Sequence, residues 1–248
     1  MWLGIWMIFN MNNLKVKIFA DGADLKQMIS MAENSFIGGL TTNPTLMRKA
    51  GILNYEKFAK DALKVIKTKP ISFEIFSDDI EEMKKQGKII ASWGKNVYVK
   101  VPITTTSGES TKSVINYLAE NNVKLNITAV MSSKQVLDVM NYLNPEVPSC
   151  VSVFAGRIAD TGRDPIPILR ECIQILAENR NSELIWASPR ELLNIIQANE
   201  IGCHIITVTN EILLKIPLVG KDLNLYSLET VRMFYNDALA AGYSMSNE

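Results

Sequence analysis

Apolar runs of four to seven residues alternate along the chain with longer amphipathic segments. This alternation is typical of βα units, in which successive strands build a parallel sheet. The strands are predicted at residues 16–21, 38–42, 71–76, 97–101, 124–128, 151–155, 184–187 and 205–208, and the helices at 24–35, 53–67, 78–93, 108–121, 132–143, 164–179, 189–200 and 227–241. Eight such units predict an α/β fold, a single-domain (β/α)8 TIM barrel. A doubly wound open sheet is the alternative, although the GxGxxG of many nucleotide-binding sheets is absent from the sequence.

Local signals support the helix boundaries. Ser188-Pro189 followed by Glu191 predicts a helix with a capping hydroxyl, a proline at its first position and a glutamate in its first turn. Asp164-Pro165 predicts a second capped start. No Gly/Ser-rich linker, charge run or low-complexity tract divides the sequence. We therefore expect one (β/α)8 barrel catalytic domain over residues 15–248.

An apolar N-terminal extension over residues 1–14 precedes the predicted barrel. Its stretch MWLGIWMIF is far shorter than the roughly 20 residues that span a bilayer, and no basic segment precedes it, so a cleaved signal is not expected. Two interpretations remain for this stretch. It arises from a start codon upstream of Met11, or it is a short apolar arm that covers a barrel end or a subunit contact.

Charge and composition narrow the chemistry. The 26 basic and 26 acidic side chains among 248 residues give a net charge of zero, which disfavours nucleic acid and anionic membranes as partners. Cys150, Cys172 and Cys203 have no CxxC spacing and read as free thiols of a reducing, cytoplasmic compartment. A single histidine, His204, excludes a zinc site built on several His ligands. We expect catalysis by Lys, Arg, carboxylate, amide and hydroxyl groups, with no cofactor and no metal.

Polar residues inside the apolar strands indicate where a site would lie. In the strand 97–101 the three valines share one face, so Tyr98 and Lys100 are predicted to point into the barrel. Most of the inward polar positions fall near the C-terminal ends of the strands, where barrel enzymes keep their active sites. The same alternation directs a further set of side chains inward: Asp21, Glu74, Asn126, Thr128, Ser152 and Phe154.

Lys100 is the most informative of these residues. A lone Asn, Ser or Thr near a strand end is more often a turn or cap residue than a catalyst. A buried unpaired ammonium, in contrast, costs several kcal/mol. One interpretation of Lys100 is an ion pair with Asp21 or Glu74. The other, which we favour, is an amine of depressed pKa that attacks a carbonyl to form a Schiff base.

Six segments, in this order, resemble the transaldolase family in its short form. The resemblance covers about residues 15 to 241 and implies a (β/α)8 barrel with its Schiff-base lysine on the fourth strand, where Lys100 falls. The segments are Asp21 after an apolar strand, Thr41-Thr42-Asn43-Pro44, Phe73-Glu74, Val97-Tyr98-Val99-Lys100-Val101-Pro102, Asn126-Ile127-Thr128 and Ser152-Val153-Phe154-Ala155-Gly156-Arg157.

The resemblance also implies four catalytic residues. Lys100 would form an imine with the C2 ketone of a ketose phosphate. Asp21 would take the C4 hydroxyl proton in the retro-aldol step. Glu74 would act with Thr128 through a water in forming and hydrolysing the imine.

The substrate-binding residues implied by the resemblance fall into two groups. One group would hold the dihydroxyacetone moiety, with Ser152 near its C1 hydroxyl, and the other would hold the phosphate. Ser188 and Arg190 also lie at a predicted helix N-terminus, where unpaired amides favour an anion. The full set is Thr42, Asn43, Asn126, Ser152 and Phe154 for the first region and Arg157, Ser188 and Arg190 for the phosphate.

Three functions remain open. The first is a transaldolase of the pentose phosphate pathway, which moves a dihydroxyacetone unit from fructose 6-phosphate or sedoheptulose 7-phosphate to erythrose 4-phosphate or glyceraldehyde 3-phosphate. The second is fructose-6-phosphate aldolase, which releases free dihydroxyacetone. The third is a catalytically silent barrel that serves as a binding or regulatory protein. The resemblance also implies sugar phosphate substrates and a homo-oligomer, with a decamer of stacked pentamers as one form.

Four positions discriminate among these functions. Aldolase members resemble one another in carrying glutamine at the position of Glu74 and tyrosine at that of Phe154. This chain carries the transferase pair. A silent barrel would be favoured by the loss of Lys100 or Asp21, and both are present. The transaldolase reaction is therefore the predicted function.

Overall fold

The computed structural model describes residues 14–245, and the chain divides into two compact units. One unit covers residues 14–214, and the described part of the other covers residues 215–245. Residues 1–13 of the predicted apolar extension lie outside the described residues.

The unit over residues 14–214 is built on a closed barrel of eight parallel strands in sequence order. The closed sheet confirms the (β/α)8 barrel prediction and rules out the open doubly wound alternative. The strands are β1 (Lys17–Asp21), β2 (Ile37–Thr41), β3 (Ile71–Glu74), β4 (Val97–Pro102), β5 (Leu125–Val130), β6 (Ser149–Val153), β7 (Ser182–Trp186) and β8 (Ile205–Thr209).

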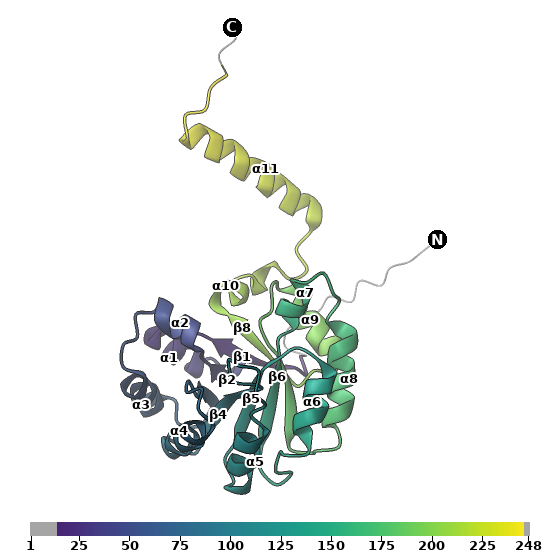
Figure 1. The fold of residues 1–248 in the computed structure, drawn as a ribbon. Coiled ribbons are helices and arrows are strands. Elements are labelled where there is room, and N and C mark those ends of the chain that lie inside the picture. Colours follow the sequence, from purple (N-terminus) through teal and green to yellow (C-terminus); the bar gives the residue numbers. More distant parts are fainter. Residues whose placement is uncertain (1–13, 246–248) are drawn as a thin grey trace. The chain divides into compact units, whose positions relative to one another are not determined.

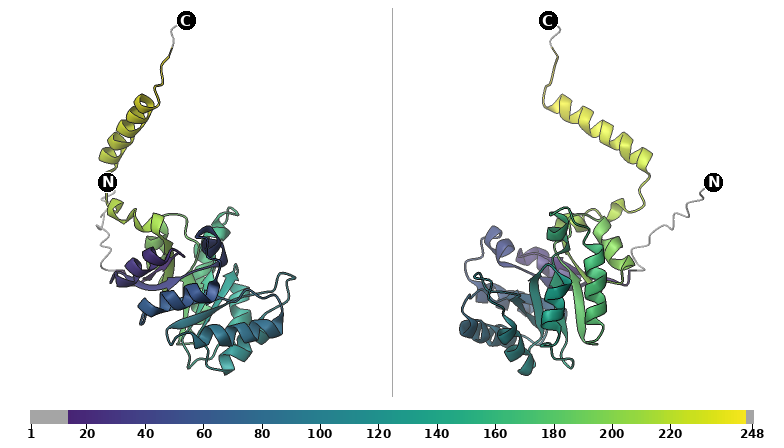
Figure 2. Two further views of the ribbon diagram at one scale, coloured as in Figure 1. Left: turned by 90° about the vertical axis from the view of Figure 1, so that its left-hand side faces the viewer. Right: turned by 45° about the vertical axis from the view of Figure 1, so that its right-hand side comes forward.

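Helices surround these strands (Figures 1 and 2). Seven of the observed helices lie within the seven ranges predicted as helical between residues 24 and 200. These are α1 (Leu25–Glu33), α3 (Tyr55–Val65), α4 (Ile80–Ser92), α5 (Lys112–Glu120), α6 (Ser133–Met140), α8 (Ile166–Leu176) and α9 (Leu193–Glu200). Three further helices of four to six residues were not predicted, because they are too short to show a helical period: α2 (Pro44–Lys49), α7 (Ala155–Ala159) and α10 (Asn210–Leu213).

Apolar side chains fill the barrel interior beneath the cavity, and polar side chains gather toward the C-terminal ends of the strands. Phe19, Cys150, Ile185 and Ile205 form part of a buried cluster, against which the inward-pointing Tyr98 and Phe154 pack. Gly39 on β2 makes room for this layer, since a Cβ atom there would lie 2.5 Å from the Phe19 ring. The lower barrel is therefore filled, and open space is left at the C-terminal ends of the strands.

One predicted helix start is confirmed and the other is wrong. The Asp164 carboxylate accepts the N–H of Ile166, 2.9 Å away, at the start of α8. Ser188, in contrast, has a left-handed backbone with φ 60° and does not cap a helix, because an N-cap residue takes an extended conformation. The helix begins only at Leu193, and the Asn194 side chain accepts the N–H groups of Arg190 and Glu191 instead.

The described part of the second unit contains η2 (Ile216–Leu218) and α11 (Leu223–Ala240). The Asp222 side chain caps α11 by accepting the N–H of Leu225. The predicted helix 227–241 falls on α11, which begins four residues earlier. Membership of this segment in one catalytic domain over 15–248 stays a prediction. Among the described residues, no helix combines the length and apolar character needed to cross a membrane.

Candidate active site

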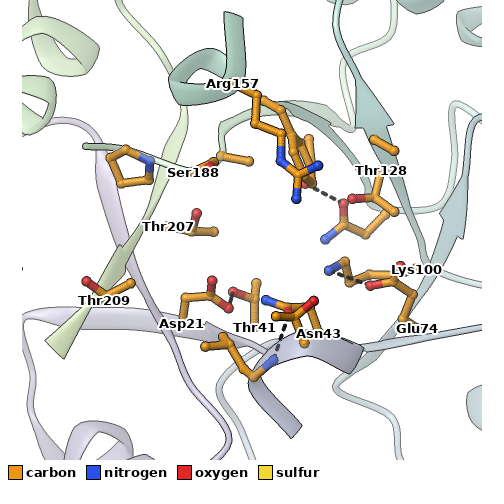
Figure 3. Close-up of a pocket in the computed structure, with 18 of the residues that line it drawn as sticks. Asp21, Thr41, Asn43, Glu74, Lys100, Thr128, Arg157, Ser188, Thr207 and Thr209 are labelled. Atoms are coloured by element: carbon orange, nitrogen blue, oxygen red, sulfur yellow. Dashed lines mark hydrogen bonds and ion pairs between the residues drawn. The ribbon is translucent and has the colours of Figure 1, made fainter. Parts of the chain in front are cut away.

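A cavity of about 510 Å³ opens at the C-terminal ends of the barrel strands. Figure 3 shows side chains from several strands pointing into it, with Arg157 and Ser188 across the cavity from Asp21 and Asn43. The structure brings together every predicted site residue except Thr42 as part of the lining: Asp21, Asn43, Glu74, Lys100, Asn126, Thr128, Ser152, Phe154, Arg157, Ser188 and Arg190.

Lys100 lies on β4 with only 7% of its surface exposed. Its Nζ is 2.9 Å from Glu74 Oε2, and it also donates a hydrogen bond to the main-chain carbonyl of Thr42 at 3.1 Å. The ion pair with Glu74, one of the two interpretations of Lys100, is therefore present. It does not exclude a nucleophilic role, because the Glu74 carboxylate is placed to take the proton that an ammonium must lose before it attacks a carbonyl.

The two threonines at the end of β2 contribute in different ways. Thr42 is fully buried and meets Lys100 through its carbonyl, while the preceding Thr41 lines the cavity. The Thr41 hydroxyl donates to Asp21 Oδ1 at 3.0 Å, across the paired strands β1 and β2. The structure thus places the side chain of Thr41, rather than that of Thr42, against the cavity.

Asp21 is a third ionisable group that lines the cavity, beside Lys100 and Glu74. Burial raises the pKa of its carboxyl, and the nearby negative charge of Glu74 adds to that rise. The positive charge of Lys100 and the hydrogen bond from Thr41 lower the pKa, but less than burial raises it. A carboxyl with a raised pKa in a cleft is suited to accept and return a proton.

A hydrogen-bonded row crosses the barrel interior beside Lys100. The Ser152 hydroxyl donates to Asn126 Oδ1 at 2.7 Å, and Asn126 Nδ2 donates to the Ser72 hydroxyl at 3.1 Å. These two bonds hold the Asn126 amide between the hydroxyls of Ser72 and Ser152. Asn43 is held differently: its Oδ1 accepts the N–H of Leu46 and caps α2, which leaves its Nδ2 to donate to a ligand.

Thr128 lies beside an irregularity in β5. Ala129 has a left-handed backbone with φ 62°, and the β5–β6 register shifts between Ile127 and Val130. The Thr128 hydroxyl oxygen is buried and makes no hydrogen bond to any described residue. Backbone strain of this kind clusters at functional sites, and a buried hydroxyl without a protein partner is available to a ligand or a water molecule.

The basic side of the cavity is built by α7 and the segment after β7. Gly156 on α7 lies so close to this segment that a Cβ atom there would be 1.6 Å from the Ser188 carbonyl oxygen. The Arg157 guanidinium lies 5.2 Å from the centre of the Phe154 ring, a cation–π arrangement. Two arginines and a hydroxyl on one side of a cavity are suited to bind an anion.

Arg190 also contacts a carboxylate. Its Nε donates to Asp160 Oδ1 at 3.0 Å, and its Nη2 donates to Asp160 Oδ2. Hydrogen bonds from Arg190 hold the pKa of Asp160 below its usual range. Asp160 is the C-cap residue of α7 and follows Arg157 by three residues, so both side chains lie on the same side of this helix.

Several residues in or beside this site were not predicted from the sequence. The alternation of side chains along a strand could have indicated Thr207 and Thr209 on β8. It could also have indicated Thr41, one position before Thr42, and Ser72, two positions before Glu74. Asp160 carried no signal in the chain, because its importance depends on contact with a residue 30 positions away.

The sequence of the chain is similar to those of known aldolase-type enzymes. A family model described as transaldolase/fructose-6-phosphate aldolase matches residues 18–245. The chain belongs to this family. The family is one of transaldolase-type aldolases, so the chain is an enzyme of that type and the cavity at the strand ends is its candidate active site.

Individual relatives of the transaldolase/fructose-6-phosphate aldolase family match most of the chain. A protein of Sulfurihydrogenibium sp. (strain YO3AOP1) named "Probable transaldolase" is 34% identical over 194 residues, which are 78% of this chain and 85% of the relative. A protein of Herpetosiphon aurantiacus with the same name is 29% identical over 218 residues, 86% of this chain and 94% of the relative.

The fold also resembles that of a solved structure. It is a putative fructose-1,6-biphosphate aldolase from Coccidioides immitis, which has a TM-score of 0.54 and 10% identity over 80% of this chain and 78% of that chain. At this identity the likeness concerns the fold alone.

Proposed function

We propose that this chain is a transaldolase that transfers a dihydroxyacetone unit from fructose 6-phosphate or sedoheptulose 7-phosphate to erythrose 4-phosphate or glyceraldehyde 3-phosphate. The observation that carries the proposal is Lys100, the one lysine among the described residues that line the cavity, held 2.9 Å from Glu74. The names of the relatives support the same reaction. These sugar phosphates belong to the pentose phosphate pathway.

In the first step Lys100 becomes the nucleophile. Its ammonium passes a proton toward Glu74, and the neutral Nζ attacks the C2 carbonyl of the ketose to give a carbinolamine. The C2–O bond then breaks, water leaves, and a protonated imine forms. Two observations support a role for Glu74 and Thr128, acting through a water, in this step and in its reversal. One is the ion pair of Glu74 with Lys100, and the other is that the Thr128 hydroxyl has no hydrogen-bond partner among the described residues.

In the second step Asp21 takes the proton of the C4 hydroxyl. The C3–C4 bond breaks, its electron pair neutralises the imine as an enamine, and an aldose phosphate leaves with a new aldehyde. The enamine carbon then attacks the aldehyde of the acceptor, and Asp21 returns its proton to the new hydroxyl. Water finally hydrolyses the imine and frees Lys100. The burial that raises the pKa of Asp21 supports this assignment.

The remaining site residues bind the substrate. Asn43 and Asn126 hold the dihydroxyacetone unit, and Ser152 lies near its C1 hydroxyl, while the Thr42 carbonyl orients Lys100. Arg157, Ser188 and Arg190 take the phosphate, for which paired arginine donors are well suited. Phe154 closes the cavity beneath Arg157.

Phe154 and Glu74 favour transfer over release of dihydroxyacetone. The bound enamine either waits for an acceptor or is protonated at carbon and hydrolysed. The Phe154 ring offers no hydroxyl that could hydrogen-bond the water needed for release. One added hydrogen bond of about 1 kcal/mol would shift this partition several-fold.

The test is an assay of two products side by side. With fructose 6-phosphate and erythrose 4-phosphate, the wild type is expected to form sedoheptulose 7-phosphate faster than it releases dihydroxyacetone, and Phe154→Tyr is expected to shift the ratio toward release. Lys100→Met should abolish both activities. A wild type that releases dihydroxyacetone faster than it transfers it would replace the proposal by fructose-6-phosphate aldolase.

A further inference from the structure

We propose that Tyr55, the first residue of α3, is a positioning residue that holds the backbone of Glu74 and so places its carboxylate against Lys100. The inference rests on the proposed function, which assigns Glu74 to imine formation and hydrolysis. Tyr55 is not among the residues that line the cavity, so it acts through Glu74 and not on the substrate.

The barrel has a gap in its hydrogen bonding beside Glu74. Pairing between β2 and β3 ends at Thr41 and Ser72, two residues before Glu74, because the chain then turns into α2. Pairing between β3 and β4 continues as far as Glu74 and Lys100. Among the described strands, the end of β3 is thus paired with β4 alone.

The direction of the backbone groups shows which of them lack a strand partner. In a parallel sheet the N–H and C=O of one residue point toward the same neighbouring strand, and the next residue points the other way. Ile75 donates its N–H to the carbonyl of Lys100 at 3.0 Å, so it faces β4. The N–H and C=O of Glu74 therefore face the side of β2, where the ladder has already ended, and both need a partner.

The Tyr55 hydroxyl is the hydrogen-bond partner of both backbone groups of Glu74. Its oxygen accepts the Glu74 N–H at 2.6 Å, and its O–H donates to the Glu74 carbonyl at 2.9 Å. A hydroxyl can do both because it carries one donor and two acceptor lone pairs. One side chain thus replaces the strand neighbour that β2 does not provide.

The Tyr55 ring is fixed by its surroundings. Its centre lies 6.3 Å from that of Phe73, 5.8 Å from that of Trp93 and 5.4 Å from that of Phe76. Burial raises the pKa of the Tyr55 hydroxyl, so this group keeps its proton and remains a donor. A locked ring with a protonated hydroxyl is suited to hold a neighbouring backbone in one place.

The test uses Tyr55→Phe, which keeps the ring and removes only the hydroxyl. Tyr117→Phe, on the half-exposed surface of α5, is the matched control for the loss of one tyrosine hydroxyl. With fructose 6-phosphate, Tyr55→Phe is expected to lower kcat and the rate of borohydride-trapped adduct formation by about 3- to 10-fold each. KM should change less than twofold, and Tyr117→Phe should match the wild type.

A second variant separates positioning from general stability. If Tyr55 acts through the Glu74 carboxylate, adding Tyr55→Phe to Glu74→Gln should slow adduct formation no further than Glu74→Gln alone. An equal slowing in both backgrounds, or a Tyr55→Phe protein with a lower Tm but normal kcat, would overturn the proposal.

Failure of this proposal is distinguishable from failure of the proposed function. A wild type that forms no adduct contradicts the transaldolase mechanism itself. A wild type that is slowed by Glu74→Gln but not by Tyr55→Phe contradicts the role of Tyr55 alone.

Hydrogen exchange provides a measurement on the wild type, free of any folding defect in a variant. The Glu74 amide should be protected from exchange, as expected for a group bonded to the Tyr55 hydroxyl. Exchange at the rate of an open loop amide would overturn the proposal.

Discussion

Lys100 is a buried and Asp21 a partly buried ionisable group, and the barrel holds each in place with neighbouring polar groups. Lys100 is fixed by Glu74 and the Thr42 carbonyl, and Asp21 by the Thr41 hydroxyl. Because the Thr41 hydroxyl stabilises the ionised form of the Asp21 carboxyl more than the protonated form, the pH dependence of the reaction reports on this contact.

Asp21 must be ionised to take a proton, so kcat is expected to fall as pH falls through its pKa. Burial raises that pKa, which places the acid limb of the kcat profile at higher pH than for an ordinary aspartate. Thr41→Val removes a hydrogen bond that lowers the pKa and should move the limb to still higher pH. The check is the pH profile of kcat for both proteins. A limb that stays in place or moves to lower pH contradicts the assignment of Asp21 as the base.

Arg190→Ala is expected to weaken binding of phosphorylated substrates more than it slows the chemical step. A phosphate contact remote from the C3–C4 bond binds the ground state and the transition state alike. Loss of a charged hydrogen bond should raise KM about 10- to 100-fold. Arg180→Ala, which removes an exposed arginine paired with Glu146, is the control and should leave KM unchanged. An unchanged KM in Arg190→Ala would place the phosphate elsewhere.

The inward direction of a side chain could be predicted where side chains alternate along a strand. A role that depends on contact between residues distant in the sequence could not. The valines of β4 showed that Lys100 points inward, and the same reasoning placed Glu74, Asn126 and Ser152. Tyr55 gave no such signal. Its role depends on the early end of β2, which the apolar pattern of the sequence does not reveal.

At the scale of elements, the close approach of α7 to the segment after β7 builds the basic side of the cavity. The sequence predicted a helix start at Ser188, and this prediction was wrong because Ser188 adopts a left-handed backbone instead of an extended cap. That conformation presents its carbonyl toward Gly156 on α7. A pattern of cap residues cannot report such a tertiary contact.

Gly156→Ala is expected to push α7 away from Ser188, since its Cβ would lie 1.6 Å from the Ser188 carbonyl oxygen. We expect a loss of about 1 to 3 kcal/mol in the free energy of unfolding and a raised KM for fructose 6-phosphate. Gly38→Ala, whose Cβ would meet its nearest atom at 3.5 Å, is the matched control. Denaturant unfolding and steady-state kinetics measure both effects. Wild-type stability and KM in Gly156→Ala would show that this contact does not shape the site.

At the scale of the whole molecule, a closed barrel collects residues that are far apart in the chain. Asp21 on β1 and Thr209 on β8 are paired across the closure although 188 positions separate them. The repeated βα pattern predicted this arrangement, because eight parallel strands with intervening helices close with their C-terminal ends together. The division of the chain near residue 215 was not predicted, since neither composition nor a linker marks it.

The central claim is that Lys100 forms an imine with the ketose, and reductive trapping tests it most directly. Borohydride added with fructose 6-phosphate should increase the mass of the wild type by one reduced dihydroxyacetone unit, and peptide mapping should place the adduct on Lys100. Lys100→Met should show neither the adduct nor turnover. An adduct on another lysine, or a Lys100→Met protein that is labelled normally, would contradict the account.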